Sequence, residues 1–201
     1  MKHERMSHRP RRFFPLLAAG LGWAALAAAL MGAAPAAQAF EDRGTAVYVE
    51  AGQAPHSAGN TDVLSAGAMI PWGSRRSLRA GELSFYWDLF ASQWHAPAGS
   101  LRRDYAQLGA IGTWRLRFDQ GRSPWFVEAG VGGSLIDRLY HTPSRDFSTA
   151  FQFTEVLGAG YSFGERGQHE LSLRLQHFSN AGIKKPNQGE NFVRLRYAWR
   201  F

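Results

Sequence analysis

The chain has 201 residues, no cysteine and a formal net charge of +7, with 23 Lys and Arg against 16 Asp and Glu. The lack of cysteine excludes disulfides, thiol nucleophiles and thiolate metal sites within the chain. The excess of basic residues does not indicate a nucleic-acid partner. Residues 1–39 hold five of the basic residues and one acidic residue, so the remainder carries only +3 and contains no basic run.

The N-terminus predicts a cleaved signal peptide over residues 1–39. Basic residues precede an apolar segment at about 13–33, and Ala37-Gln38-Ala39 supplies the small residues that signal peptidase requires. The alternative is a single membrane anchor, against which these small residues and Pro35 argue. The mature chain, residues 40–201, is then one domain, and it has no apolar stretch long enough for a spanning helix.

The mature sequence alternates between apolar and polar residues in segments separated by Gly, Pro, Asn and Asp. A strand that crosses a bilayer at a tilt needs about 9–11 residues, and single-chain outer-membrane barrels have an even number of strands. We therefore predict an all-β fold, an eight-stranded antiparallel transmembrane β-barrel of the bacterial outer membrane. The expected strands are 44–52, 61–71, 82–94, 104–117, 124–136, 147–163, 169–178 and 190–201.

The last segment gives the clearest barrel pattern. Its apolar face carries Val193, Leu195, Tyr197, Trp199 and Phe201, and its other face carries Arg194, Arg196, Ala198 and Arg200. Arginines facing a packed sandwich core would be too costly, whereas inside a small barrel they can pair with acids. The expected partners are Glu50, Asp88 or Glu128. A C-terminal phenylalanine after such alternation also resembles the recognition signal of outer-membrane proteins.

The links between strands orient the predicted barrel. Shorter links around 72–81, 118–123 and 164–168 alternate with those around 53–60, 95–103, 137–146 and 179–189. Shorter turns are periplasmic in such barrels. The seventh strand then runs outward, so its C-terminal end reaches the outer leaflet.

That strand carries a candidate for ester chemistry. Leu171, Leu173, Leu175, His177 and Ser179 share one face by the two-residue period. Because the leucines must face lipid, His177 and Ser179 face lipid too, at outer-leaflet depth. Such a pair has the nucleophile–base relation of acyl transfer, here toward a lipid substrate. The alternative is that both are ordinary polar residues of the headgroup layer.

The segment from His177 to Asn191, HFSNAGIKKPNQGEN, resembles the signature of the lipid A 3-O-deacylase (PagL) family, H-[aromatic]-S-N-A-G-[aliphatic]-K-x-P-N-x-G. Weaker similarity covers residues 124–132 and 158–160. The resemblance implies an eight-stranded barrel preceded by a signal peptide. It also implies hydrolysis of the 3-O-linked acyl ester of lipid A in lipopolysaccharide, with release of a 3-hydroxy fatty acid and no cofactor.

The resemblance also implies roles for individual residues. Ser179 would attack the ester carbonyl, and His177 would act as general base and then general acid. Asn180 matches a further activity-critical position, acting through the oxyanion site. Backbone N–H groups near Gly182 and the side chain of Asn187 are other oxyanion candidates.

The acid that would orient His177 is where this sequence departs from the family. The family's acid falls at the position of Asn191, whereas the glutamate here is one residue earlier, at Glu190. A one-residue shift reverses the face of a strand, so parity selects Asn191. A bulge at Gly189 would instead turn Glu190 outward. We favour Glu190, because a carboxylate stabilises an imidazolium better than an amide does.

Other features leave alternatives open. The histidines outside this segment show no metal-ligand spacing and are expected in solvent: His56, His95 and His141 in surface loops and His169 at a turn. The tryptophans at 72, 87, 94, 125 and 199 are expected at the interfaces or facing lipid. An adhesin or structural barrel and a lipid A palmitoyltransferase remain alternative functions. The acyl-chain preference and a possible homodimer stay open.

Overall fold

The computed structural model describes residues 40, 42, 44–56 and 59–201. The predicted signal peptide over residues 1–39 lies outside these residues, so its cleavage stays a prediction. Within the described part, no helix has the length and apolar character that crossing a membrane would require.

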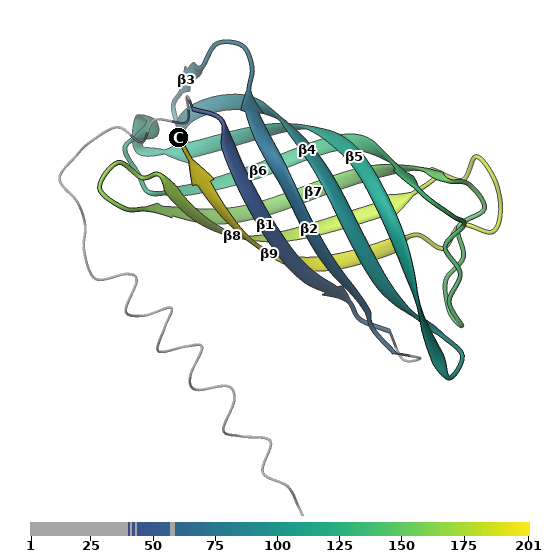
Figure 1. Cartoon of the computed structure of the whole chain (residues 1–201). Coiled ribbons are helices and arrows are strands. Elements are labelled where there is room, and N and C mark those ends of the chain that lie inside the picture. The colour runs from purple at the N-terminus through teal and green to yellow at the C-terminus, as the bar shows by residue number, and fades with distance from the viewer. Residues whose placement is uncertain (1–39, 41, 43, 57–58) are drawn as a thin grey trace, which may run out of the picture. The chain divides into compact units, whose positions relative to one another are not determined.

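The described residues form a closed antiparallel barrel (Figure 1). Each strand pairs with its neighbours in the chain, and β1 closes the sheet by pairing with β9. β2 pairs directly with β4, so the short β3 only extends one end of β4. The eight remaining strands confirm the predicted barrel. The strands are β1 (Ala46–Ala54), β2 (Thr61–Pro71), β3 (Arg76–Leu78), β4 (Gly81–Ala98), β5 (Leu101–Phe118), β6 (Trp125–Ile136), β7 (Phe151–Phe163), β8 (His169–Ser179) and β9 (Glu190–Arg200), with a 3-10 turn η1 (Asp119–Gly121) after β5.

The link expected around 95–103 is wrong, because β4 and β5 continue through it. They end in a tight turn at Gly99 and Ser100, where Gly99 adopts φ +68°. His95 therefore lies in β4, opposite Asp104 of β5, rather than in a loop. Glycine supplies the positive φ that a two-residue hairpin needs, which lets the alternation continue almost to the tip.

The barrel wall separates apolar from charged residues. Exposed side chains on the outer face are largely apolar and include Leu64, Leu89, Leu108, Val131, Leu157, Leu173 and Leu195. The inner face carries buried arginines and acids. This arrangement is the reverse of a soluble protein and matches a barrel whose outer surface meets lipid.

The interior charges are paired with one another. Glu50 binds Arg194 at 2.7 Å and Arg196 at 2.8 Å, and Asp88 binds Arg196 at 2.9 Å. Glu128 lies 3.2 Å from Arg174. The prediction that inward arginines of the last strand pair with Glu50 and Asp88 is confirmed, whereas Glu128 pairs with arginines of other strands.

Buried aromatic rings fill the barrel interior near the β8–β9 loop. Trp94 is fully buried, with ring centroids 5.1 Å from Phe178 and 4.7 Å from Phe192. Tyr140 and Phe147 of the β6–β7 link pack on the same indole. The expectation that Trp94 faces lipid or the interface is wrong. Trp94 and Asp88 are an even number of residues apart on β4, so both side chains point into the barrel. This aromatic cluster supports the strand ends that carry the candidate site.

Candidate active site

The C-terminal end of β8 presents His177 and Ser179 on the outer face of the barrel. Their side chains are partly exposed. Phe178, which lies between them in the sequence, and Gln176, which precedes His177, are buried. Leu171, Leu173 and Leu175 continue the same outer face, as expected from the two-residue period. The loop that follows lies at the end of the barrel away from the C-terminus (Figure 1).

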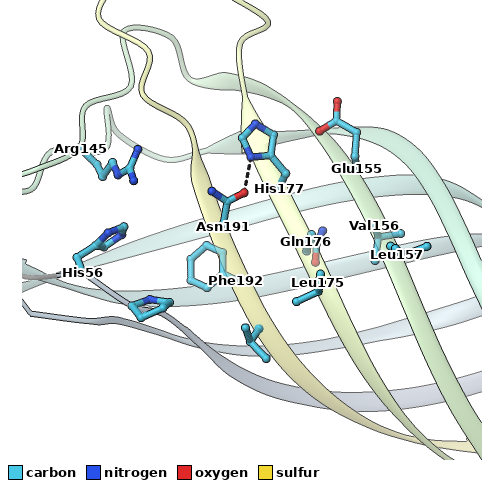
Figure 2. Close-up of a pocket in the computed structure, with 12 residues that line it drawn as sticks. His56, Arg145, Glu155, Val156, Leu157, Leu175, Gln176, His177, Asn191 and Phe192 are labelled. Atoms are coloured by element: carbon cyan, nitrogen blue, oxygen red, sulfur yellow. Dashed lines mark hydrogen bonds between the residues drawn. The ribbon is translucent and has the colours of Figure 1, made fainter.

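Asn191 of β9 holds the imidazole ring of His177. The two residues are directly opposite in the β8–β9 ladder, and His177 Nδ1 lies 2.7 Å from Asn191 Oδ1 (Figure 2). An amide oxygen only accepts, so Nδ1 must carry the hydrogen, and the neutral ring then has a free lone pair on Nε2. Nε2 is therefore available as a base.

Glu190 does not contact His177, contrary to the interaction that we favoured from sequence. It is fully buried, and its carboxylate accepts hydrogen bonds from Tyr140 OH at 2.8 Å and from Asn191 N at 3.0 Å, with His56 Nε2 also at 2.8 Å. The ladder between β8 and β9 runs without a bulge from Phe178 opposite Glu190 onward. Strand parity therefore keeps Glu190 inside and places Asn191 beside the histidine.

His56 is also not the solvent-exposed loop residue that was expected. Its side chain is only 10 % exposed because it lies against the buried carboxylate of Glu190. Together, Glu190, His56 and Tyr140 tie the β1–β2 and β6–β7 links to the start of β9.

The polar groups of Asn180 have partners in the β8–β9 loop and in the β6–β7 link. The buried side chain donates to Lys184 O at 2.8 Å and Ser148 Oγ at 3.1 Å, and its oxygen accepts from Gly182 N at 3.0 Å. The Asn187 side chain accepts from the backbone N–H of Asn180. The NH2 group of Asn180 and the N–H of Gly182 thus have partners, whereas the Asn187 side chain is engaged through its oxygen.

A backbone N–H next to Gly182, in the region that the sequence indicated, lies beside the candidate nucleophile. Ala181 N–H points to Ser179 Oγ at 3.4 Å, and Ala181 has a positive φ of 53°. A backbone N–H held beside a nucleophilic oxygen is the kind of donor that stabilises an oxyanion.

Gly189 allows the loop to pass close over His177. A Cβ atom at this position would lie 2.6 Å from Cε1 and 3.2 Å from Nε2 of the imidazole, and the φ of Gly189 is +68°. Both the contact and the backbone conformation therefore require glycine. The backbone at Gly189 packs against the imidazole ring, and Asn191 binds the same ring through its Nδ1 atom.

An open groove of about 580 Å³ begins at His177 and follows the outer wall. Its lining includes the apolar side chains of Leu157, Leu175 and Val193. Arg145 and His56 also line it, on the side of Asn191 away from Glu155 (Figure 2). An apolar groove that begins at His177 is suited to an acyl chain.

The sequence profile of the lipid A 3-O-deacylase (PagL) family matches residues 62–200. The chain belongs to this family. It is 31% identical over 130 residues to the lipid A deacylase PagL of Bordetella bronchiseptica, covering 65% of this chain and 70% of that protein. It is 26% identical over 117 residues to the lipid A deacylase PagL of Pseudomonas aeruginosa, covering 58% of this chain and 65% of that protein.

A solved structure described as the outer membrane enzyme PagL has the same fold. It aligns with a TM-score of 0.66 at 23% identity, over 78% of this chain and 99% of that one. This barrel is therefore an outer-membrane ester hydrolase of the lipid A 3-O-deacylase family.

Two residues of the groove were missed at the sequence level. Arg145 lies in a link whose conformation the alternation pattern does not specify. Glu155 could have been found, because it interrupts the apolar outer face of β7 between Phe153 and Leu157. The same parity rule that singled out His177 applies to it.

Proposed function

We propose that this chain hydrolyses the acyl ester at the 3-position of lipid A with Ser179 as nucleophile and His177 as general base. The observation that carries the proposal is the outward-facing His177 whose ring is fixed by Asn191, two residues before Ser179 on a lipid-facing wall. A polar pair in this position is suited to a substrate that approaches from the membrane rather than from solvent.

The proposed reaction has two steps. Ser179 Oγ attacks the ester carbonyl while His177 Nε2 accepts its proton, and the proton then passes to the 3-oxygen of the sugar as that bond breaks. Water next attacks the acyl-enzyme with His177 again as base. The products are a free 3-hydroxy fatty acid and a lipid A that bears a hydroxyl at the 3-position.

Two hydrogen bonds at the site, rather than a contact between Ser179 and His177, support this sequence of events. The bond from His177 Nδ1 to Asn191 Oδ1 leaves Nε2 as the nitrogen that can accept a proton, and Ala181 N–H lies beside the attacking oxygen as the first oxyanion donor. Asn180 contributes by holding the turn that presents this N–H, since its own polar atoms are used within the loop.

We further propose that the site faces the outer leaflet. His177 and Ser179 lie at the end of the barrel away from the C-terminus, and the links at the C-terminal end include the shorter turns after β5 and β7. Lipopolysaccharide in the outer leaflet would then reach the site directly from the membrane. A homodimer stays a prediction, which sedimentation of the purified protein in detergent tests.

The test uses Ser179→Ala and His177→Ala proteins refolded in detergent and mixed with lipopolysaccharide. Each should lower the initial deacylation rate by at least about 1,000-fold, because both groups take part in bond making. Mass spectrometry of lipid A should show loss of one hydroxyacyl chain with the unaltered protein. A gain of mass that requires phospholipid would instead indicate an acyltransferase.

Two control variants carry the same substitutions away from the site. Ser100→Ala changes a serine in the exposed β4–β5 turn, and His169→Ala changes a histidine at the other end of β8. Both should retain the full rate. Deacylation by Ser179→Ala at the rate of Ser100→Ala would refute the serine mechanism.

A further inference from the structure

A glutamate lies next to His177 in the sheet, on the side away from Asn191. Glu155 of β7 is in direct register with His177, as Asn191 is from β9 (Figure 2). Side chains directly opposite one another in an antiparallel pair have Cβ atoms about 4.5–5.5 Å apart. The three side chains therefore form a row across the outer face of β7, β8 and β9, with the imidazole in the middle.

The surroundings of Glu155 give no structural reason for a charge. Its neighbours on the outer face of β7 are Phe153 and Leu157, both exposed, and Phe151 packs on Phe153 with ring centroids 5.0 Å apart. Two phenylalanines thus separate the carboxylate from the β6–β7 link. Among the residues that the structure describes, no cation or side-chain donor pairs with Glu155. A charge on a lipid-facing wall is unfavourable and commonly marks function.

The site needs an acid that β9 does not supply. Asn191 orients the ring but is neutral, and Glu190 is buried on the inner face with His56 and Tyr140. Of the described residues that line the groove, Glu155 is the single carboxylate; the other ionisable side chains there are His56, Arg145 and His177 itself. An opposite charge within about 4–6 Å favours the charged form of an ionisable group.

We propose that Glu155 is the acid of this site, a positioning residue that acts through His177. Asn191 fixes the ring and its tautomer from one side, and Glu155 stabilises the imidazolium from the other side as the serine proton is transferred. The two tasks that one carboxylate performs in a serine–histidine–acid triad are divided between two strands. The inference rests on the proposed function, because it assigns a partner to the same histidine.

The experiment measures kcat and KM for lipopolysaccharide deacylation by the full barrel in detergent. Glu155→Gln should lower kcat by on the order of 10-fold or more with KM nearly unchanged, because the charge acts on the proton transfer. Glu155→Asp keeps the charge and should retain most of the kcat. The matched control is Glu165→Gln in the exposed β7–β8 turn, which should behave as the unaltered protein.

A rescue variant tests the division of tasks directly. Adding Asn191→Glu to Glu155→Gln returns a carboxylate to the other side of the ring and should recover most of the lost kcat. A double variant that remains as slow as Glu155→Gln would contradict the proposal. So would a Glu155→Asp protein that is as slow as Glu155→Gln, since charge would then not be the requirement.

The remaining outcomes separate this inference from the function on which it rests. Glu155→Gln turnover equal to that of Glu165→Gln, with Ser179→Ala inactive, overturns the role of Glu155 and leaves the esterase mechanism intact. A raised KM with unchanged kcat also overturns it, because Glu155 would then bind substrate. A Ser179→Ala protein that still deacylates lipopolysaccharide would refute the proposed serine mechanism, and with it the role of Glu155.

Discussion

Replacing Glu190 separates a structural role from a catalytic one. Its carboxylate has three neighbours within hydrogen-bond distance: His56 and Tyr140 at 2.8 Å and Asn191 N at 3.0 Å. A hydrogen bond to a charged group contributes about 1.5–3 kcal/mol. The simple sum overstates the loss, since Tyr140 also bonds Thr61. We expect Glu190→Ala to lower the free energy of unfolding by about 3–5 kcal/mol, because buried hydrogen-bonding groups around it lose their partner.

Glu190→Gln preserves the shape and most of the hydrogen bonds, so we expect a loss of only about 1 kcal/mol. Its kcat should remain within a few-fold of the unaltered protein, because the residue does not contact His177. An amide in place of a triad acid lowers kcat by about 10,000-fold in serine proteases. Asn191→Ala should show the opposite pattern, with kcat reduced and stability nearly unchanged.

The assay combines urea unfolding in detergent micelles, followed by tryptophan fluorescence, with initial rates of deacylation. Trp94 reports on the relevant region because it packs against Tyr140 and Phe192. A Glu190→Gln protein that unfolds at the usual urea concentration but has lost turnover by orders of magnitude would refute our assignment and restore Glu190 as the catalytic acid.

Three further predictions concern the surroundings of the site. Gly189→Ala should lower kcat by about 10-fold or more and destabilise the barrel by about 1–2 kcal/mol, since its Cβ would meet His177 and its φ is +68°. Trp94→Ala should cost about 3–5 kcal/mol in urea unfolding, as a buried aromatic side chain is lost. Burial raises the pKa of Asp42, but the guanidinium groups of Arg115 and Arg117 outweigh it and hold that pKa well below its usual range. The ion pair therefore contributes stability above about pH 4 that falls away as the pH is lowered further, and Asp42→Asn should remove this part of the acid sensitivity of unfolding.

The barrel could be predicted from sequence because its pattern is redundant. Most of the strands alternate with a period of two, and inward arginines such as Arg194 and Arg196 allow no soluble sandwich. The boundaries near Gly99 could not be predicted, because His95 and Asp104 are equally suited to a loop and to an exposed strand extension. Trp94 was misplaced because tryptophan is common at membrane interfaces, although its parity on β4 already assigned it to the interior.

The candidate site was only half specified by the sequence. His177 and Ser179 follow from parity on one strand, which is local information. The contact between His177 and Asn191 and the register of Glu155 depend on how β7, β8 and β9 pair, which is non-local. Parity selected Asn191 correctly, whereas the chemical preference for a carboxylate led us to Glu190.

The two faces of β9 explain why this preference failed. On the inner face, Glu190 links the β1–β2 and β6–β7 connections and lies beside the aromatic cluster, so it is held by burial. On the outer face, Asn191 meets lipid, where a neutral amide is less costly to expose than a carboxylate. A neutral residue at this position can orient the histidine but cannot neutralise its charge. Our proposal therefore takes the acid from another strand, and Glu155 is the glutamate that the register places beside the histidine.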